Sequence, residues 1–122
     1  MKVFIADDSA TFRERLKELL SEVTGIEIIG EAGDGTEAIR GIQELKPDLV
    51  ILGIRMPGGN GIDTLKNIKK MKQAPVVIMI TNYPYPQYRK KCMELGADYF
   101  FKKSTEFEKI IEVIEQLAEN KP

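Results

Sequence analysis

Four polar side chains of the kind that contact metal ions and phosphoryl oxygens each follow an apolar run of the sequence. Asp7 and Asp8 follow the first run, Thr81 follows a later one, and Lys103 follows the last. Two adjacent carboxylates repel each other unless a cation lies between them, and oxygen ligands without His or Cys suit Mg²⁺. A hydroxyl and an ammonium group donate hydrogen bonds where negative charge gathers. The residue types therefore predict a site for a cation and a phosphoryl group.

A simpler interpretation is that the acidic pair only begins a helix. Asp8 or Ser9 could cap that helix, but a cap needs only one residue, so the second acid stays unexplained. The chain has no histidine, which excludes His-based metal sites, Ser-His triads and phosphohistidine carriers. The single cysteine, Cys92, has helical spacing to Tyr88 and Leu95, which favours core packing over a nucleophile.

The elements that must position these residues are five apolar runs that alternate with amphipathic helical stretches. This alternation predicts a parallel sheet covered by helices on both faces. Because the carboxyl ends of parallel strands meet at one edge, the four polar residues should converge there. The first, third and fourth runs are continuously apolar and should be the central strands. The predicted strands are Val3 to Ala6, Glu27 to Glu31, Asp48 to Leu52, Val76 to Ile80 and Asp98 to Lys102.

Capping residues, Pro and Gly predict where the helices begin and end, and the periodicity of apolar residues predicts their inward faces. Thr11 and Glu14 have the spacing of a capping box, Pro47 prevents the second helix from continuing, and Pro86 and Gly96 bracket the fourth. The predicted inward residues, helix by helix, are Phe12, Leu16, Leu19, Leu20 and Val23; Ala38, Ile39, Ile42 and Leu45; Ile62, Leu65 and Ile68; Tyr88, Cys92 and Leu95; and Phe107, Ile110, Ile111, Ile114 and Leu117.

Length and composition predict a single domain over residues 1–122 with a loose tail at 119–122. Hydrophobic residues make up 43% and charged residues 30%, and no apolar run could cross a bilayer, so we expect a cytoplasmic protein without membrane contact. A net charge of -1 argues against direct nucleic-acid binding. Lysines 66, 69, 70 and 72 and the basic run 89–91 are interpreted as solvated helix faces rather than patches for anionic partners.

The chain resembles the response-regulator receiver family over essentially its whole length. The motifs that carry the resemblance are the acidic pair Asp7-Asp8, the segment from Leu49 to Gly61 with its Met-Pro, and the separate residues Thr81, Phe100 and Lys103. The resemblance implies an α/β fold of the flavodoxin-like type: a doubly wound sheet of five parallel strands in the order 2-1-3-4-5.

In that family an aspartate attacks the phosphorus of a phosphohistidine or an acyl phosphate. The resemblance implies that Asp8 is a direct Mg²⁺ ligand, that Asp7 binds the ion through water, and that Arg55 contributes its backbone carbonyl. It also implies that Thr81 and Lys103 contact the phosphoryl oxygens. Thr81 and Phe100 would then form the conformational switch.

The sequence departs from the family at the acceptor itself, because Gly53 stands where the aspartate belongs. A glycine supplies neither the nucleophile nor the metal ligand, so we expect ordinary phosphorylation to be lost and Mg²⁺ binding to be weakened or absent. Lys103 should then pair with Asp7 or Asp8. The intact surroundings of Gly53 favour an ordinary receiver altered at this position over one that lacks the aspartate by nature.

The resemblance also implies partners of two kinds. One is a sensor histidine kinase or phosphotransfer protein, and the other is a downstream protein bound on the face of the fourth helix, fifth strand and last helix. A receiver of this form is a protein-interaction switch rather than an enzyme. The alternatives are a small Mg²⁺-dependent phosphotransferase or phosphatase that uses Asp7 or Asp8, and a flavodoxin-like cofactor carrier. The second is disfavoured because two acids occupy the loop that would have to bind phosphate.

Overall fold

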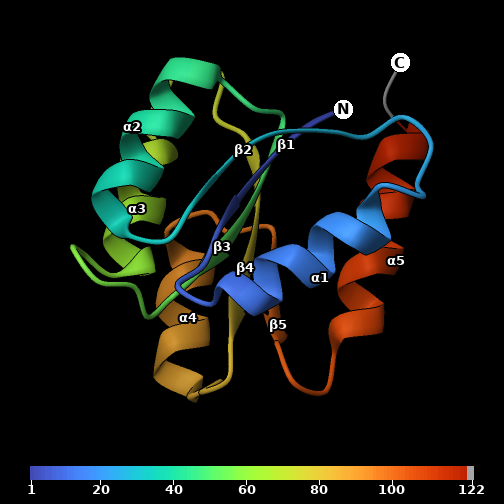
Figure 1. Ribbon diagram of the computed structural model, residues 1–122. Coiled ribbons are helices and arrows are strands. Elements are labelled where there is room, and N and C mark those ends of the chain that lie inside the picture. The colour runs from blue at the N-terminus through green and yellow to red at the C-terminus, as the bar shows by residue number, and fades with distance from the viewer. Residues whose placement is uncertain (121–122) are drawn as a thin grey trace.

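The computed structural model describes residues 1–120, in which five strands alternate with five helices (Figure 1). Each strand leads into the helix that follows it. In chain order they are β1 (Lys2–Ala6), α1 (Ala10–Leu20), β2 (Glu27–Ala32), α2 (Gly35–Leu45), β3 (Leu49–Gly53), α3 (Gly61–Ile68), β4 (Val76–Thr81), α4 (Pro86–Glu94), β5 (Tyr99–Lys102) and α5 (Phe107–Asn120).

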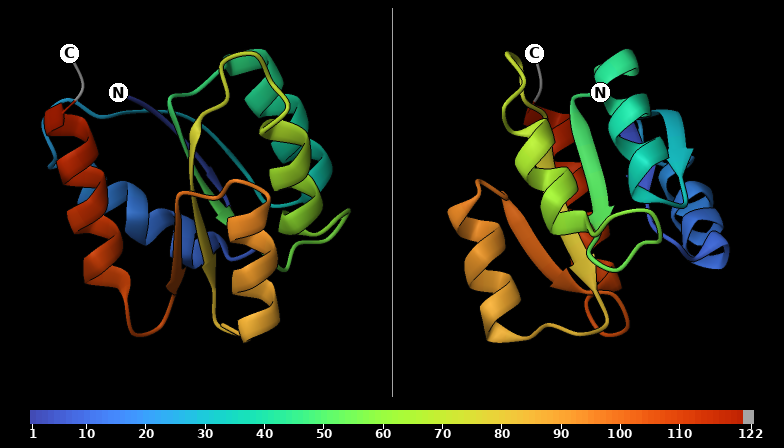
Figure 2. Two further views of the ribbon diagram at one scale, coloured as in Figure 1. Left: turned by 180° about the vertical axis from the view of Figure 1, so that it is seen from behind. Right: turned by 90° about the vertical axis from the view of Figure 1, so that its left-hand side faces the viewer.

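The strands form one parallel sheet in the order β2-β1-β3-β4-β5, which confirms the predicted fold. Helices α1 and α5 cover one face of the sheet, and α2, α3 and α4 cover the other (Figure 2). Each face has its own apolar core, because successive side chains of a strand point to opposite faces. Phe4 of β1 contributes to the core under α2, α3 and α4, whereas Val3 and Ile5 contribute to the core under α1 and α5.

The three central strands are the three continuously apolar runs, as predicted. All of β3 is buried, as is β1 after Lys2 and β4 after Val76. The edge strands β2 and β5 are only partly buried, and they carry more polar residues. Strand ends differ from the predicted limits by one residue, and β3 reaches Gly53, which pairs with Ile80 of β4.

The start of α1 agrees with one of the two predicted start signals, a cap at Asp8 or Ser9, and contradicts the other, a capping box of Thr11 and Glu14. Ser9 is the N-cap residue, and its hydroxyl oxygen accepts a hydrogen bond from the Phe12 N–H at 3.2 Å. The Ser9 carbonyl also accepts the first helical bond, from the Arg13 N–H. Thr11 therefore lies within the first turn, and the predicted capping box of Thr11 and Glu14 is wrong. Two residues that could cap stand close together here, and the earlier one begins the helix.

Two predicted core residues and part of the predicted tail are also corrected. Leu19 is 38% exposed and Leu45 is 42% exposed, because each lies at the edge of its helix's apolar face rather than at its centre. Glu119 and Asn120 belong to α5, so the tail does not begin at residue 119; residues 121 and 122 lie outside the described part. Among residues 1–120, no helix combines the length and the apolar character that crossing a bilayer requires.

The loop between β3 and α3 is held against the end of β3. The Gly61 N–H donates to the Ile54 carbonyl at 2.6 Å, and a Cβ at position 61 would overlap the Gly53 carbonyl oxygen. Only glycine allows the first turn of α3 to approach β3 this closely. The approach fixes the loop that carries Arg55 beside the ends of the strands.

Candidate functional site

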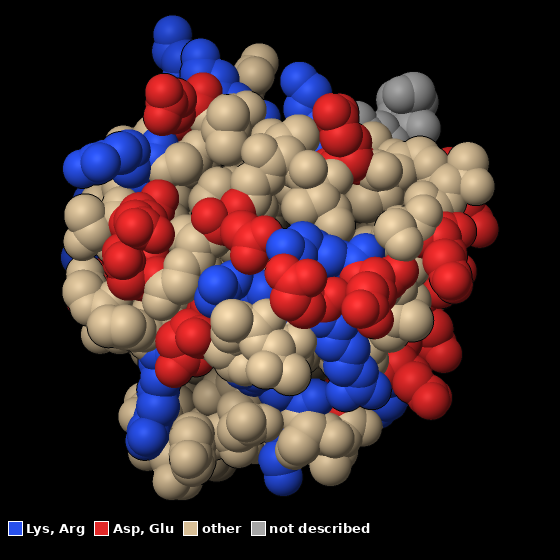
Figure 3. Space-filling model, viewed as in Figure 1, with Lys and Arg blue, Asp and Glu red and all other residues tan. Residues whose placement is uncertain are grey.

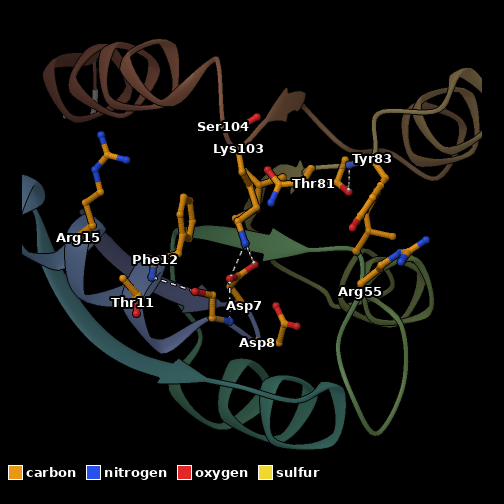
Figure 4. Close-up of a pocket in the computed structure, with 14 residues that line it drawn as sticks. Asp7, Asp8, Thr11, Phe12, Arg15, Arg55, Thr81, Tyr83, Lys103 and Ser104 are labelled. Atoms are coloured by element: carbon orange, nitrogen blue, oxygen red, sulfur yellow. Dashed lines mark hydrogen bonds and ion pairs between the residues drawn. The ribbon is translucent and has the colours of Figure 1, made fainter.

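A pocket of about 570 Å³ lies at the carboxyl edge of the sheet, at the ends of β1, β3, β4 and β5 (Figure 4). It brings together the predicted residues Asp7, Asp8, Arg55, Thr81 and Lys103. Strand pairing explains the convergence, since β1 and β4 both neighbour β3 and β5 neighbours β4. The Lys103 N–H donates to the Thr81 carbonyl at 2.9 Å, which continues the β4–β5 ladder and places the lysine at this edge.

The centre of the pocket is an ion pair between Lys103 and Asp7. The Lys103 Nζ lies 2.8 Å from one Asp7 carboxylate oxygen and 3.0 Å from the other. The Asp7 side chain is 2% exposed and that of Lys103 is 13% exposed, so the pair is largely shielded from water. The Ser9 N–H also donates to Asp7, and the Phe12 ring lies 4.5 Å from the ammonium group. The predicted pairing of Lys103 with one of the two acids is confirmed, and the partner is Asp7.

Gly53 lies directly beside this ion pair. A Cβ built on Gly53 would be 2.6 Å from the Asp7 Oδ1, which is closer than real Cβ atoms approach. The Asp7 carboxylate thus lies in the space that the first side-chain atom of residue 53 would need. The absence of a side chain at position 53 is what accommodates Asp7 in this orientation.

Asp8 and Arg55 line the open side of the pocket. The Asp8 side chain is exposed, and among residues 1–120 no hydrogen bond or ion pair to it is found. The Arg55 guanidinium lies 4.1 Å from the centre of the Tyr83 ring, so it is drawn to the β4–α4 loop (Figure 4). This cation–π contact links the two loops at the mouth of the pocket.

The two predicted switch residues occupy different environments. Thr81 lines the pocket, and its hydroxyl oxygen accepts a hydrogen bond from the Tyr83 N–H at 3.0 Å. Phe100 is not part of the pocket lining; it is 4% exposed and packs in the core beneath α2, α3 and α4. The Arg89 guanidinium lies 4.7 Å from the centre of its ring.

The side chains present fit a Mg²⁺ ion poorly. Both oxygens of Asp7 are engaged by Lys103, which leaves Asp8 as the one pocket carboxylate without a cation. Within the part of the chain that the structure describes, no three His, Cys, Asp or Glu side chains are close enough to share a metal. Affinity for divalent cations rises with the charge of the ligand set, and a single available carboxylate supplies little of it.

Sequence reasoning missed several residues of the site. Ser9 was considered only as a cap, and Phe12 only as a core residue, yet both contact the central ion pair. The helical spacing of Phe12 gave the correct face but could not show that its ring reaches Lys103. The contact of Arg55 with Tyr83 joins two irregular loops, and no periodic signal in the sequence predicts it.

Two kinds of comparison identify relatives of this chain. The family model described as response regulator receiver domain matches residues 3–115. The transcriptional regulatory protein PdtaR of Mycobacterium tuberculosis is 38% identical over 114 residues, which cover 93% of this chain and 55% of PdtaR. A protein-glutamate methylesterase/protein-glutamine glutaminase of Desulfotalea psychrophila is 38% identical over 108 residues, covering 87% of this chain and 30% of the relative. The chain thus spans between about a third and about half of these relatives.

Comparison with solved structures also identifies response regulators as similar to this chain. The response regulator domain of Thermotoga maritima CheB superposes with a TM-score of 0.85 at 32% identity, covering 100% of this chain and 98% of that one. A chain of the CheX-CheY-BeF3-Mg complex of Borrelia burgdorferi superposes with a TM-score of 0.87 at 31% identity, covering 96% and 88%.

Proposed function

The chain belongs to the response regulator receiver family of two-component signalling, and on that premise we propose that it is a protein-interaction module that does not accept a phosphoryl group in the ordinary way. The observation that carries the proposal is Gly53 at the end of β3, with the Asp7 carboxylate in the space where a side chain would begin. A nucleophilic substitution at phosphorus needs an atom that attacks, and position 53 offers none.

Neither remaining acid is well placed to replace the acceptor. The Asp7 carboxylate accepts hydrogen bonds from Lys103 and from the Ser9 N–H, which reduces its ability to attack phosphorus. Asp8 is exposed, and among residues 1–120 no lysine forms a hydrogen bond or an ion pair with it, so it has no bound cation to neutralise an incoming phosphate. A phosphotransferase or phosphatase that uses Asp7 or Asp8 is therefore the weaker alternative.

Receiver domains generally bind Mg²⁺ at the phosphorylation site, and we propose that this chain binds it weakly. Asp8, and Arg55 through its backbone carbonyl, would hold the ion when bound, and the ion would supply positive charge for phosphoryl oxygens. Asp7 could contribute only by giving up part of its contact with Lys103. The pocket is accordingly expected to favour the internal cation, Lys103, over the external one.

Receiver domains interact with histidine kinases, phosphotransfer proteins or effector domains, and we propose that this one signals by partner binding on the face of α4, β5 and α5. Thr81 and Phe100 are the proposed switch residues that connect the pocket with that face. The Thr81 hydroxyl is already bonded to the Tyr83 N–H, and Phe100 is already buried beneath α4. A partner would then change their packing without a phosphoryl group as trigger.

The decisive experiment is intact-mass measurement after incubation with acetyl phosphate and Mg²⁺. The unsubstituted chain should gain no mass, whereas Gly53→Asp should gain one phosphoryl group. Gly53→Asn is the matched control, since it has nearly the same size but no carboxylate, and circular dichroism checks that both variants fold around the shifted Asp7. Phosphorylation of the unsubstituted chain would refute the proposal and favour Asp7 or Asp8 as nucleophile.

A second prediction concerns Mg²⁺ itself. Calorimetric titration should show that Gly53→Asp binds Mg²⁺ at least about tenfold more tightly than the unsubstituted chain, because a third carboxylate adds ligand charge. Gly53→Asn should show no such gain. Equal affinity in the unsubstituted chain and in Gly53→Asp would contradict the proposed competition between Lys103 and the metal.

A further inference from the structure

A second cavity, of about 410 Å³, lies beside the phosphorylation-site pocket, between the starts of α3 and α4. We call it the α3–α4 groove. Ile54 and Met56 lie in its lining and are almost fully buried, while Ile62 of α3 and Tyr88 of α4 are half-buried. Asp8 and Arg55 lie at its end nearest the pocket. The groove therefore offers an apolar interior of a size that accepts a bulky side chain.

Exposed cations border the groove on both helices. Lys66 lies four residues after Ile62 in α3, and Lys91 lies three residues after Tyr88 in α4, so each shares a helix face with a residue of the lining. Both lysines are exposed, and among residues 1–120 neither forms an ion pair. Lys69 differs, because its ammonium group pairs with Asp98 at 2.9 Å.

An aromatic surface continues from the groove along the β4–α4 loop. The rings of Tyr88 and Tyr85 are 5.4 Å apart, those of Tyr85 and Tyr83 are 6.4 Å apart, and Arg55 lies against the Tyr83 ring. Tyr83 and Tyr85 are each 45% exposed. Tyrosine is enriched among the residues that contribute most to binding at protein interfaces, and tyrosines that already pack on one another lose little side-chain freedom on binding.

From this combination we infer that the α3–α4 groove is a docking site for an acidic segment of another protein that carries a bulky apolar residue. The apolar residue enters between Ile62 and Tyr88, and the acidic residues meet Lys66, Lys91 and Arg55. Charge complementarity selects this partner, since Lys66 and Lys91 on the two helical walls and Arg55 at the end of the groove outnumber Asp8, the one carboxylate of the lining. The site is separate from the α4-β5-α5 face, because it lies on the flank of α4 that faces α3.

The sequence alone favoured a solvated-face interpretation for these lysines. The groove changes that interpretation for Lys66 and Lys91, because each shares a helix face with an apolar or aromatic residue of the groove lining. It leaves the interpretation unchanged for Lys72 and Lys90, which are exposed and do not share the faces of Ile62 and Tyr88.

Binding is tested by following backbone amide signals in NMR titrations with three synthetic peptides. The first carries Leu-Phe between Asp and Glu residues, the second replaces its acids with Lys, and the third replaces Leu-Phe with Ser-Ser. Only the first should shift the signals of Ile62, Lys66, Tyr88 and Lys91. The titrations contain neither acyl phosphate nor Mg²⁺, so their outcome is independent of the proposed loss of phosphorylation.

Charge-reversal variants make the test specific. Lys66→Glu combined with Lys91→Glu should weaken binding of the first peptide at least about tenfold. Lys72→Glu combined with Lys90→Glu changes the net charge equally and should leave binding nearly unchanged. No binding at millimolar peptide, equal weakening by both double variants, or shifts confined to other surfaces would each overturn the inference.

A second copy of this chain is the competing occupant, because acidic side chains gather over α5 along the right margin of Figure 3. Sedimentation at rising protein concentration distinguishes it. A constant monomer mass supports a foreign acidic segment. A rise in mass that Lys66→Glu with Lys91→Glu abolishes would assign the groove to self-association and overturn the inference.

Discussion

At the end of β1, the Asp7 carboxylate, the Lys103 ammonium group and the missing side chain of Gly53 form one interdependent unit. The carboxylate is nearly inaccessible to water, so its charge is tolerated only because Lys103 and the Ser9 N–H compensate it. Its orientation in turn requires that residue 53 has no Cβ. A substitution at Asp7, Lys103 or Gly53 should therefore alter the packing or the charge balance at the other two positions.

Gly53→Ala should reveal this coupling. The added methyl group would collide with Asp7, and overpacking of this kind costs about 1 to 3 kcal/mol, partly offset by about 0.5 to 1 kcal/mol because alanine orders more easily than glycine. We expect a net destabilisation of about 1 kcal/mol in urea unfolding. In an Asp7→Ala background the collision is gone, and the same substitution should stabilise slightly. Equal effects in both backgrounds would mean that Asp7 does not occupy this space.

Residue-level reasoning predicted which side chains meet but not how they pair. Asp7, Thr81 and Lys103 follow parallel strands, so their convergence is a consequence of sheet geometry. The choice between Asp7 and Asp8 as the partner of Lys103 depends on which side chain turns inward after β1. Because Asp7 and Asp8 are adjacent and of the same type, the sequence alone does not show which of the two side chains turns inward.

Among the elements, β2 is tied to α1 by charged side chains as well as by packing. Glu31 of β2 forms ion pairs with Arg13 and Lys17 of α1. The hydrogen bond from Lys17, and then that from Arg13, lowers the pKa of Glu31 below its ordinary value. A lowered carboxyl pKa means that the folded state favours the charged form.

Glu31 should therefore contribute pH-dependent stability. The contribution is present above the pKa of the unfolded chain, near 4.5, and is lost as the pH falls through the lower folded value. Because the carboxylate is about a third exposed, we expect no more than about 1 kcal/mol. Glu31→Gln should lower the urea midpoint near neutral pH but not in acid, whereas the matched strand variant Glu27→Gln should do so at neither. A Glu31→Gln effect that persists in acid would contradict the assignment.

The order and type of the elements were predictable because burial leaves a strong pattern. The buried strands β1, β3 and β4 are continuously apolar runs without alternating polar residues, so their assignment as strands of the core was clear. Pro86 and Gly96 mark the limits of α4. The errors lie where the pattern is weaker. Periodicity gives the direction of a helix's apolar face but not its width, so the marginal positions Leu19 and Leu45 were assigned to the core although they are exposed.

At the scale of the whole molecule, side chains inside the two cores on either side of the sheet become accessible to water and reagents only when the core that holds them opens. Cys92 is fully buried in the core under α2, α3 and α4, and burial raises the pKa of its thiol to about 11. The thiol is therefore protonated and shielded at mildly alkaline pH, and it can report on the opening of that core.

We expect Cys92 in the native protein to react with a disulfide reagent several orders of magnitude more slowly than in the unfolded chain, in proportion to the rare open state. The rate should rise with added urea as the core opens. The same chain in concentrated guanidinium gives the reference rate. Reaction of the native protein at that reference rate would show that α4 detaches freely.

The ion pair that joins β1 to β5 also has a consequence for biosynthesis. Asp7 and Lys103 are separated by 96 residues, so a ribosome needs roughly 5 to 20 s to deliver the lysine after the aspartate. Until then the carboxylate at the end of the first strand has no ammonium group to compensate its burial. The first strand can therefore reach its final packing only after the last strand has been translated. A translational pause before Lys103 should prolong the time in which chaperones can bind the incomplete sheet.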